Sequence, residues 1–242
     1  MTARFERAAR AAWLAIAVIA PPVLAASPAA AQPRRPPPPA PSAGSWEIGG
    51  GVVWIRGVDF GEHTAELTRN PGTGTGPFDL FTTTARLTEG VGFQGHLAVY
   101  LSRSIAVEGG IRYTPPKLRI HISADAENAA DQVADETIGQ YVFDGSFVYH
   151  FSHATFSRGR GIPFVAAGAG YMRDVHEDNA LIETGTEYHA TGGIKYFFDA
   201  RPRSHRFGMR GEAGFSIRDG GFDFEDKLRT VPIVMGSLMY LF

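Results

Sequence analysis

The stretch Thr230 to Phe242 reads T-V-P-I-V-M-G-S-L-M-Y-L-F and contains no charged side chain. Alternate positions of an extended strand lie on the same face of it. One such face carries Val234, Gly236, Leu238, Tyr240 and Phe242. Free chain ends usually fray into polar tails. This apolar end therefore predicts a buried, paired strand, and we interpret it as the strand that closes a β-barrel.

The composition limits the class of protein. The chain has 242 residues, which is enough for one sizeable domain after processing. Its formal net charge of -2 argues against a nucleic-acid-binding protein, which would be strongly basic. It has 29 glycines, 12% aromatic residues and no cysteine, and the lack of cysteine excludes a lipoprotein anchor.

Residues 1–31 have the pattern of a cleaved signal peptide. Arg4, Arg7 and Arg10 give the positive start, and the apolar run 11–26 follows. The cleavage site is predicted at the alanines 29–31, with 23–25 as an alternative. A transmembrane anchor is disfavoured, because two prolines at 21 and 22 leave the run shorter than the roughly 20 residues needed to span a bilayer.

Residues 32–44 are predicted to be a proline-rich linker that precedes the domain at 45–242. The four prolines at 36–39 favour a polyproline II conformation and cannot join a sheet ladder. The simplest interpretation is a spacer. Contact with peptidoglycan or with a partner is the alternative.

Alternating segments separated by turn signals predict eight strands. They are Trp46–Arg56, Glu89–Leu101, Ile105–Tyr113, Ile138–Phe151, Ile162–Val175, Thr186–Phe198, Phe207–Arg218 and Thr230–Phe242. Long loops are expected at Gly57–Arg86 and Lys117–Glu136, and the acidic, alanine-rich second loop could form a short helix. The predicted fold class is all-β, an eight-stranded antiparallel up-and-down transmembrane β-barrel.

Alternation alone does not say which face is inside. A soluble ligand-binding barrel turns its apolar face inward, and a membrane barrel does the reverse. The apolar faces here are too bulky for an eight-stranded interior, and aromatic residues lie near strand ends, as at Trp46, Trp54, Tyr113, Tyr149 and Tyr196. The pattern favours a membrane barrel over a soluble periplasmic one.

With this pattern, the hairpin F-Q-G-H-L-A-V-Y-L-S-R-S-I-A-V-E-G-G-I-R-Y and the terminal Y-L-F resemble the small outer-membrane β-barrel proteins around the OmpA transmembrane domain, OmpX and OmpW. The resemblance covers about residues 45–242. It implies that Leu238, Tyr240 and Phe242 match the signal read by the barrel-assembly machinery. We expect no peptidoglycan-binding domain after the barrel, so the resemblance does not extend to periplasmic anchoring.

The faces opposite the apolar ones carry charges of both signs, which we expect to line the barrel interior as a polar network. Buried charges need partners. The network is predicted to be a filling of ion pairs, and a gated or narrow pore is the alternative. Its members are Glu47, Glu108, Arg112, Asp144, Glu187, Lys195, Arg210, Glu212 and Arg218.

Some small outer-membrane barrels that this chain resembles are enzymes that modify lipid A with a His, a Ser and an acid. Asp144, Ser146 and His150 share one strand face. At about 3.3 Å per residue they are too far apart to form a triad by themselves. His96 or His189 from another strand would have to complete a site. An enzyme is therefore the less favoured hypothesis, and no catalytic residue is assigned.

The segment 124–136 is a candidate for divalent cations that bridge lipopolysaccharide phosphates, although its spacing matches no calcium loop. A solvated acidic loop is the preferred interpretation. Its acids are Asp125, Glu127, Asp131, Asp135 and Glu136.

We therefore expect a non-enzymatic monomer of the bacterial outer membrane with a structural, surface-interaction or narrow-pore role and without metal or cofactor. The expected partners are outer-membrane lipids, lipopolysaccharide, the barrel-assembly machinery and periplasmic chaperones, and not nucleic acid. If the terminal strand faces lipid through Phe242, then Met239 and Leu241 point inward and Pro232 lies near the outer rim. The strand must then pair with both Phe207–Arg218 and Trp46–Arg56.

Overall fold

The computed structural model describes residues 41–67, 78–127, 129–176, 181–198, 206–220 and 228–242. The predicted signal peptide, 1–31, and most of the predicted linker lie outside the described residues. The described part of the chain contains no helix that is long and apolar enough to cross a membrane.

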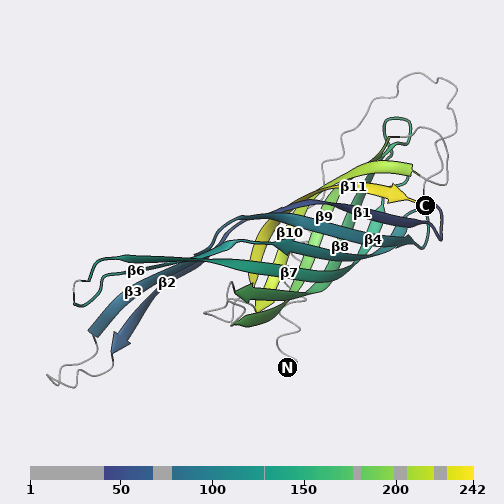
Figure 1. Cartoon of the computed structure of the whole chain (residues 1–242). Coiled ribbons are helices and arrows are strands. Elements are labelled where there is room, and N and C mark those ends of the chain that lie inside the picture. Colours follow the sequence, from purple (N-terminus) through teal and green to yellow (C-terminus); the bar gives the residue numbers. More distant parts are fainter. Residues whose placement is uncertain (1–40, 68–77, 128, 177–180, 199–205, 221–227) are drawn as a thin grey trace.

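Eight of the strands form one closed antiparallel barrel (Figure 1). Around the barrel each strand pairs with the next, and β7 pairs with β8 to close it. All eight predicted barrel strands are confirmed within a few residues. In barrel order they are β1 (Trp46–Ile55), β4 (Gly90–Tyr100), β5 (Ile105–Thr114), β7 (Gln132–His150), β8 (Gly161–His176), β9 (Ile182–Phe197), β10 (Arg206–Gly220) and β11 (Arg229–Leu241).

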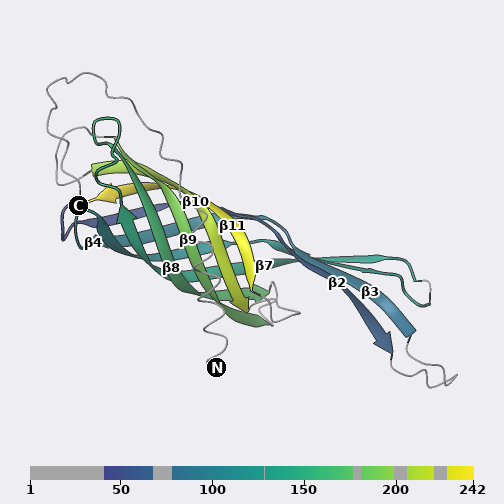
Figure 2. The same ribbon diagram turned by 180° about the vertical axis from the view of Figure 1, so that it is seen from behind.

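A second, four-stranded sheet projects from one end of the barrel (Figures 1 and 2). It consists of β2 (Val58–Leu67), β3 (Phe78–Leu87), β6 (Lys117–Ser123) and the first part of β7. The prediction of long loops at Gly57–Arg86 and Lys117–Glu136 is therefore wrong, and so is the possible short helix in the second segment. These segments continue the barrel strands outward as two long hairpins.

The projecting sheet forms because its strands keep an apolar face near the barrel. Phe60, Leu87, Leu118 and Ile138 are each at most 7% exposed and pack together at its base. Gly61 adopts a φ of 86° beside a register shift in the β2–β3 pairing, which is the left-handed conformation that glycine tolerates. The glycines, threonines and charges that indicated a loop lie among these apolar positions and mask their alternation.

The terminal strand behaves as predicted. β11 pairs with β10 on one side and with β1 on the other. Met239 and Leu241 are buried inside the barrel, whereas Phe242 is 45% exposed. Pro232 lies at the end of the barrel near the projecting sheet, and the chain end is held by reciprocal backbone hydrogen bonds of 2.7 and 2.8 Å between Trp46 and Phe242.

One glycine of β1 has no room for a side chain against β11. A Cβ atom on Gly51 of β1 would lie 2.0 Å from the carbonyl oxygen of Gly236 in β11. No side chain fits there without a backbone shift. The neighbouring Gly50 faces the other side of the strand, where a Cβ would lie 3.6 Å from the nearest atom, the carbonyl oxygen of Gln94.

Candidate functional site

The nine charged residues predicted for the interior all point into the barrel. Eight of them are at most 8% exposed, and the side chain of Asp144 is also 8% exposed. They come from five strands, β1, β5, β7, β9 and β10, so their contacts are made across the lumen as well as between neighbours.

The first group of contacts lies towards the end of the barrel that carries the chain terminus. Lys195 on β9 donates to Glu47 on β1 at 2.7 Å and to the Tyr100 hydroxyl on β4 at 3.1 Å. That hydroxyl in turn donates to Glu47 at 2.7 Å. His96 lies 3.3 Å from the same carboxylate, and the His150 ring stacks on Tyr100 with centroids 5.0 Å apart. Glu47 thus has three partners although it is completely buried.

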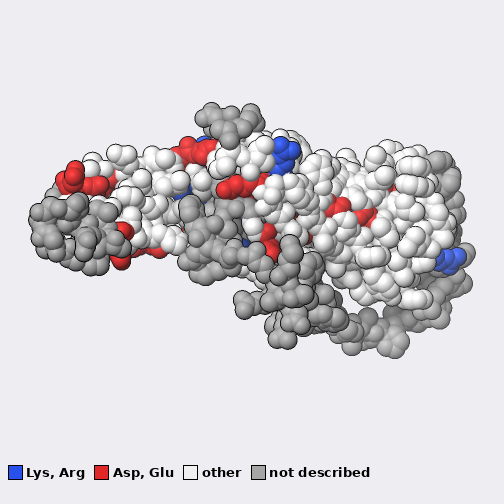
Figure 3. Space-filling model, turned by 90° about the horizontal axis from the view of Figure 1, so that it is seen from below, with Lys and Arg blue, Asp and Glu red and all other residues white. Residues whose placement is uncertain are grey.

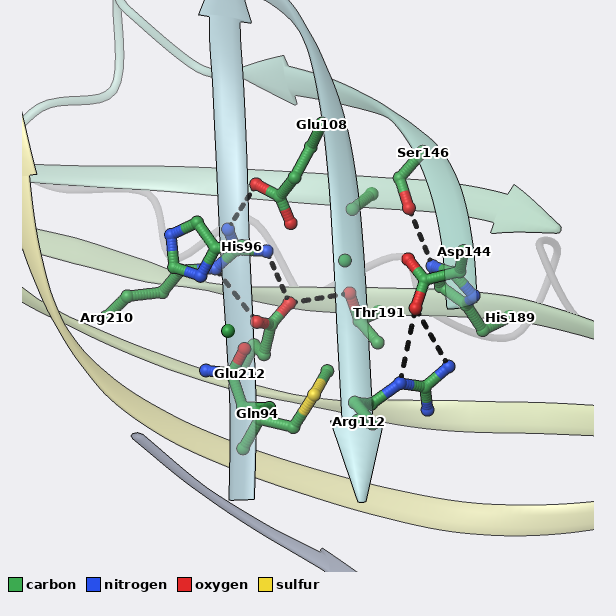
Figure 4. Close-up of a pocket in the computed structure, with 14 residues that line it drawn as sticks. Gln94, His96, Glu108, Arg112, Asp144, Ser146, His189, Thr191, Arg210 and Glu212 are labelled. Carbon is green, nitrogen blue, oxygen red and sulfur yellow. Dashed lines mark hydrogen bonds and ion pairs between the residues drawn. The ribbon is translucent and has the colours of Figure 1, made fainter. Parts of the chain in front are cut away.

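The second group lies at mid-height (Figure 4). Arg210 on β10 donates to Glu108 on β5 across the lumen at 2.5 Å and to Glu212 on its own strand at 2.9 Å. The Thr191 hydroxyl also donates to Glu212, at 2.9 Å. One guanidinium therefore joins two carboxylates that would otherwise repel each other.

The third group lies nearer the projecting sheet. Arg112 on β5 donates to Asp144 on β7 at 3.2 Å and also to Glu187 on β9. Arg218 on β10 donates to Glu187 at 3.2 Å and to Gln140 at 3.1 Å. Each predicted charge in the lumen thus has a partner of opposite sign, and three of the six ion pairs join strands that are not adjacent.

Apolar side chains close the lumen at both ends. The cluster beyond Lys195 contains Tyr100, Ala106, Val148, Ile162, Phe164, Ala166, Phe197, Met239 and Leu241. The clusters at the opposite mouth contain Val53, Ile55, Val231 and Ile233, followed by the apolar base of the projecting sheet. A cavity of about 20 Å³ lies among the ion pairs at mid-height, and another of about 30 Å³ lies at the base of the projecting sheet. A cavity of that size holds one or two water molecules.

Sequence reasoning missed several polar members of the interior. Arg206, which is 2% exposed, places its guanidinium 4.0 Å from the centre of the Phe197 ring. It lies one residue before the predicted start of its strand, so a longer strand would have included it. Asp174 is 1% exposed and belongs to β8, a strand rich in glycine and alanine whose inner face the sequence left ambiguous.

The structure brings Ser146 and His189 together, with the hydroxyl 2.8 Å from Nε2 of the ring. These are two of the residues considered for a Ser–His–acid site. Asp144, the third, is bound to Arg112 instead. The pair lines the cavity of about 20 Å³, which is too small to admit a substrate.

One group of side chains has the arrangement of metal ligands. The ligand atoms of Glu47, His96 and Glu108 lie within 4.8 Å of one another. However, Lys195 and Arg210 already lie 2.7 Å from Glu47 and 2.5 Å from Glu108. These cations compensate both carboxylates, so the three residues fit a salt-bridge network better than a metal site.

The projecting sheet is acidic and has two free edges among the described residues. β2 pairs only with β3, and residues 132–137 of β7 pair only with β6. Its described residues include three basic side chains, Arg86, Lys117 and Arg119, and Figure 3 shows the acidic ones over its length. The acidic side chains are Asp59, Glu62, Glu66, Asp79, Asp125, Glu127, Asp131, Asp135 and Glu136.

The acids of segment 124–136 bind protein groups rather than one another. Asp135 forms two hydrogen bonds of 2.7 Å with Arg119, which lower the pKa of that carboxyl below its ordinary value. Glu136 lies 2.6 Å from His176, and Asp131 lies 3.5 Å from His121. In the part of this segment that the structure describes, no three acids converge on a common point.

The outer surface of the barrel is apolar. Phe93 and Phe147 are each 70% exposed, and Leu238 is 64% exposed. The aromatic pairs on four strands of this surface are Trp46 and Trp54, Tyr141 and Tyr149, Tyr188 and Tyr196, and Phe207 and Phe215.

The chain is a small transmembrane β-barrel of the outer-membrane type. An ion-paired interior combined with an apolar exterior decides this, because a soluble barrel has the opposite polarity. The prediction of a membrane barrel is therefore confirmed, and the soluble ligand-binding barrel is excluded.

Comparisons with known proteins found similar chains among the solved structures. No protein-family model and no curated protein matches the chain. The crystal structure of the outer membrane protein OprG from Pseudomonas aeruginosa is similar over 84% of this chain and 98% of that chain, with 13% identity and a TM-score of 0.49. The crystal structure of Ail, the attachment invasion locus protein of Yersinia pestis, is similar over 83% of this chain and 99% of that chain, with 12% identity and a TM-score of 0.41. The solid-state NMR structure of the outer membrane protein AlkL in DMPC lipid bilayers is similar over 90% of this chain and 95% of that chain, with 17% identity and a TM-score of 0.38.

Proposed function

We propose that this barrel is a non-enzymatic surface-interaction protein of the bacterial outer membrane, exported through a cleaved signal peptide. The observation that carries the proposal is the contrast between a filled lumen and a projecting sheet with free edges. Lumen cavities of about 20 and 30 Å³ give no route for a solute or a substrate. The projecting sheet, by contrast, exposes backbone hydrogen-bonding groups along β2.

Orientation follows from the lengths of the connections. In barrels of this type the short turns and both chain ends face the periplasm and the long connections face outward. The chain terminus lies at the end opposite the projecting sheet (Figure 1). The sheet is therefore on the cell surface, surrounded by lipopolysaccharide. Leu238, Tyr240 and Phe242 form the strand end that the barrel-assembly machinery reads, after delivery by periplasmic chaperones.

The partner that fits β2 is an extended polypeptide segment with basic side chains. An unpaired edge binds a strand through main-chain hydrogen bonds. Glu62 and Glu66 are exposed on one face of β2. In an antiparallel pair of two β2 strands centred on Thr64, these two acids would lie opposite each other and repel, which disfavours pairing between copies. Lysine or arginine in those positions would attract.

The test uses the refolded, isotope-labelled protein and two alternating peptides, one of valine and lysine and one of valine and glutamate. We expect the basic peptide to shift and protect β2 amides, with β6 amides, which lie inside the sheet, unchanged. Equal effects of both peptides, or shifts confined to β6, would contradict the proposal. A Glu62→Gln/Glu66→Gln variant, which keeps the shape and removes both charges, should weaken binding of the basic peptide.

Planar-bilayer recordings test the closed lumen separately. We expect no stepwise ion conductance from the folded protein at moderate voltage, because ion pairs fill the lumen and apolar clusters close its ends. Reproducible steps in the wild type, absent from protein-free bilayers, would restore the narrow-pore hypothesis.

A further inference from the structure

The rim opposite the projecting sheet has a basic arc that the proposed function does not use. The arc consists of the β4–β5 turn, residues 101–104, and the β7–β8 connection, residues 151–160. The two touch, since the hydroxyl groups of Ser104 and Ser152 lie 2.9 Å apart. The connection also binds the end of β9, because the Phe197 N–H donates to the Arg160 carbonyl at 2.9 Å. The three segments thus form one continuous surface.

This arc is cationic. Arg103 and Arg158 are exposed, and neither has an ion-pair partner in the described part of the chain. Arg160 is half-buried, and its guanidinium lies 5.3 Å from the centre of the Tyr196 ring. The two segments of the arc contain no Asp or Glu. Figure 3 shows a small basic patch at this end of the molecule, opposite the acidic sheet.

The backbone of the connection presents Arg158 in an unusual way. Ser157, Arg158 and Gly159 all have positive φ, at 51°, 62° and 81°. Left-handed residues other than glycine are uncommon, and arginine is not among the types enriched there. The conformation is held by backbone hydrogen bonds of 3.0 and 3.1 Å between Phe156 and Gly161, and the Phe156 ring occupies the space where a side chain on Gly161 would lie. A fixed turn therefore carries an unpaired guanidinium at its apex.

Aromatic side chains place this arc at the level of lipid headgroups. Tyr149 and Phe151 form an edge-on pair with centroids 5.2 Å apart, and Tyr196 and Phe198 form another at 6.3 Å. Such girdles mark the boundary between hydrocarbon and water. The arginines lie just beyond this girdle in the chain, on its aqueous side, where lipid phosphates are found.

We propose that the basic arc of Arg103, Arg158 and Arg160 binds the phosphate headgroup of anionic phospholipids in the inner leaflet of the membrane. The proposal rests on the orientation given under the proposed function. A guanidinium matches the geometry of a phosphate and forms paired hydrogen bonds with it. The arc has no carboxylate to compete for the arginines, and the acidic sheet at the other end would repel the same lipids. The arc therefore selects negative headgroups on one side of the bilayer.

The test is native mass spectrometry of the folded barrel in non-ionic detergent with phosphatidylglycerol or phosphatidylcholine of identical acyl chains. We expect the wild type to retain phosphatidylglycerol preferentially at low salt. In an Arg103→Ser/Arg158→Asn variant the ratio of bound phosphatidylglycerol to bound phosphatidylcholine should fall by roughly twentyfold. Each basic residue near an anionic surface contributes a factor of about five. Asparagine is chosen at 158 because it tolerates positive φ.

Two matched controls isolate the rim. Arg103→Lys/Arg158→Lys keeps both charges and should retain most of the preference. Arg119→Ser removes an arginine from the projecting sheet and should leave the lipid preference unchanged. Heat-modifiable gel migration verifies that each variant is folded. A wild type that binds both lipids equally, or a loss of the same size in Arg119→Ser, would overturn the proposal. So would tighter binding of soluble peptidoglycan fragments that depends on the same arginines, because the cell wall would then be the partner. Failure of the β2 peptide test would leave the lipid ratio unchanged, so the two proposals fail separately.

Discussion

The ion pair between Lys195 and Glu47 gives the sharpest test of how the lumen is held together. Both residues are fully buried, and Nζ lies 2.7 Å from the carboxylate. Lys195→Met replaces the ammonium with an apolar group of similar length. It leaves the carboxylate with only Tyr100 and His96 as partners. Breaking one side of a buried pair costs about 3–5 kcal/mol, which lowers the folding equilibrium constant by roughly two to four decades.

The double variant Glu47→Gln/Lys195→Met separates the pair from the packing around it. Removing both charges leaves no uncompensated ion, so the loss should be about 1–2 kcal/mol or less. The coupling energy between the two sites is then several kcal/mol, well above the value expected for independent sites.

Urea unfolding of the barrel in lipid vesicles provides the measurement, with the fluorescence of Trp46 and Trp54 as the signal. Gel migration of the unheated sample verifies that each variant has folded before it is unfolded. The reasoning is refuted if Lys195→Met costs less than about 1 kcal/mol, or if the double variant loses as much as both single variants together.

Three further outcomes are expected. Deleting Phe242 should slow assembly into membranes more than it lowers the stability of a barrel already formed; normal insertion of the truncated chain in cells would show that the residue is dispensable. Gly51→Ala should destabilise the barrel by about 1–3 kcal/mol, because its Cβ would meet a backbone oxygen of β11, whereas Gly50→Ala should change the unfolding free energy by less than about 0.5 kcal/mol. Because Arg119 lowers the pKa of Asp135, their pair supports the projecting sheet above the ordinary carboxyl pKa and is lost as pH falls through the lowered value. The protection of β6 amides, meaning their exchange rate relative to the intrinsic rate at each pH, should therefore fall on acidification in the wild type and not in Asp135→Asn.

The barrel strands could be predicted because all except the glycine- and alanine-rich β8 carry a period-two pattern of bulky apolar residues long enough to cross a membrane. The interior charges could be predicted from the same pattern, because Glu108 and Arg112 or Arg210 and Glu212 must share the face opposite the apolar one. The projecting sheet could not, because an exposed sheet in water needs only a short apolar base, here Phe60, Leu87, Leu118 and Ile138. Beyond that base its threonines, glycines and acids are those of a loop.

The sequence by itself determined the barrel, the polarity of its two faces and the direction in which the last strand turns its side chains, since all three follow from alternation along single strands. Only the tertiary structure decided which charges meet, because Arg210 finds Glu108 and Lys195 finds Glu47 across a lumen whose stagger no single strand encodes. It also decided which apolar side chains pack together at each end of the lumen, since these clusters draw on several strands. The pairing of two hairpins into one projecting sheet is likewise a contact between segments distant in sequence, which a local pattern does not specify.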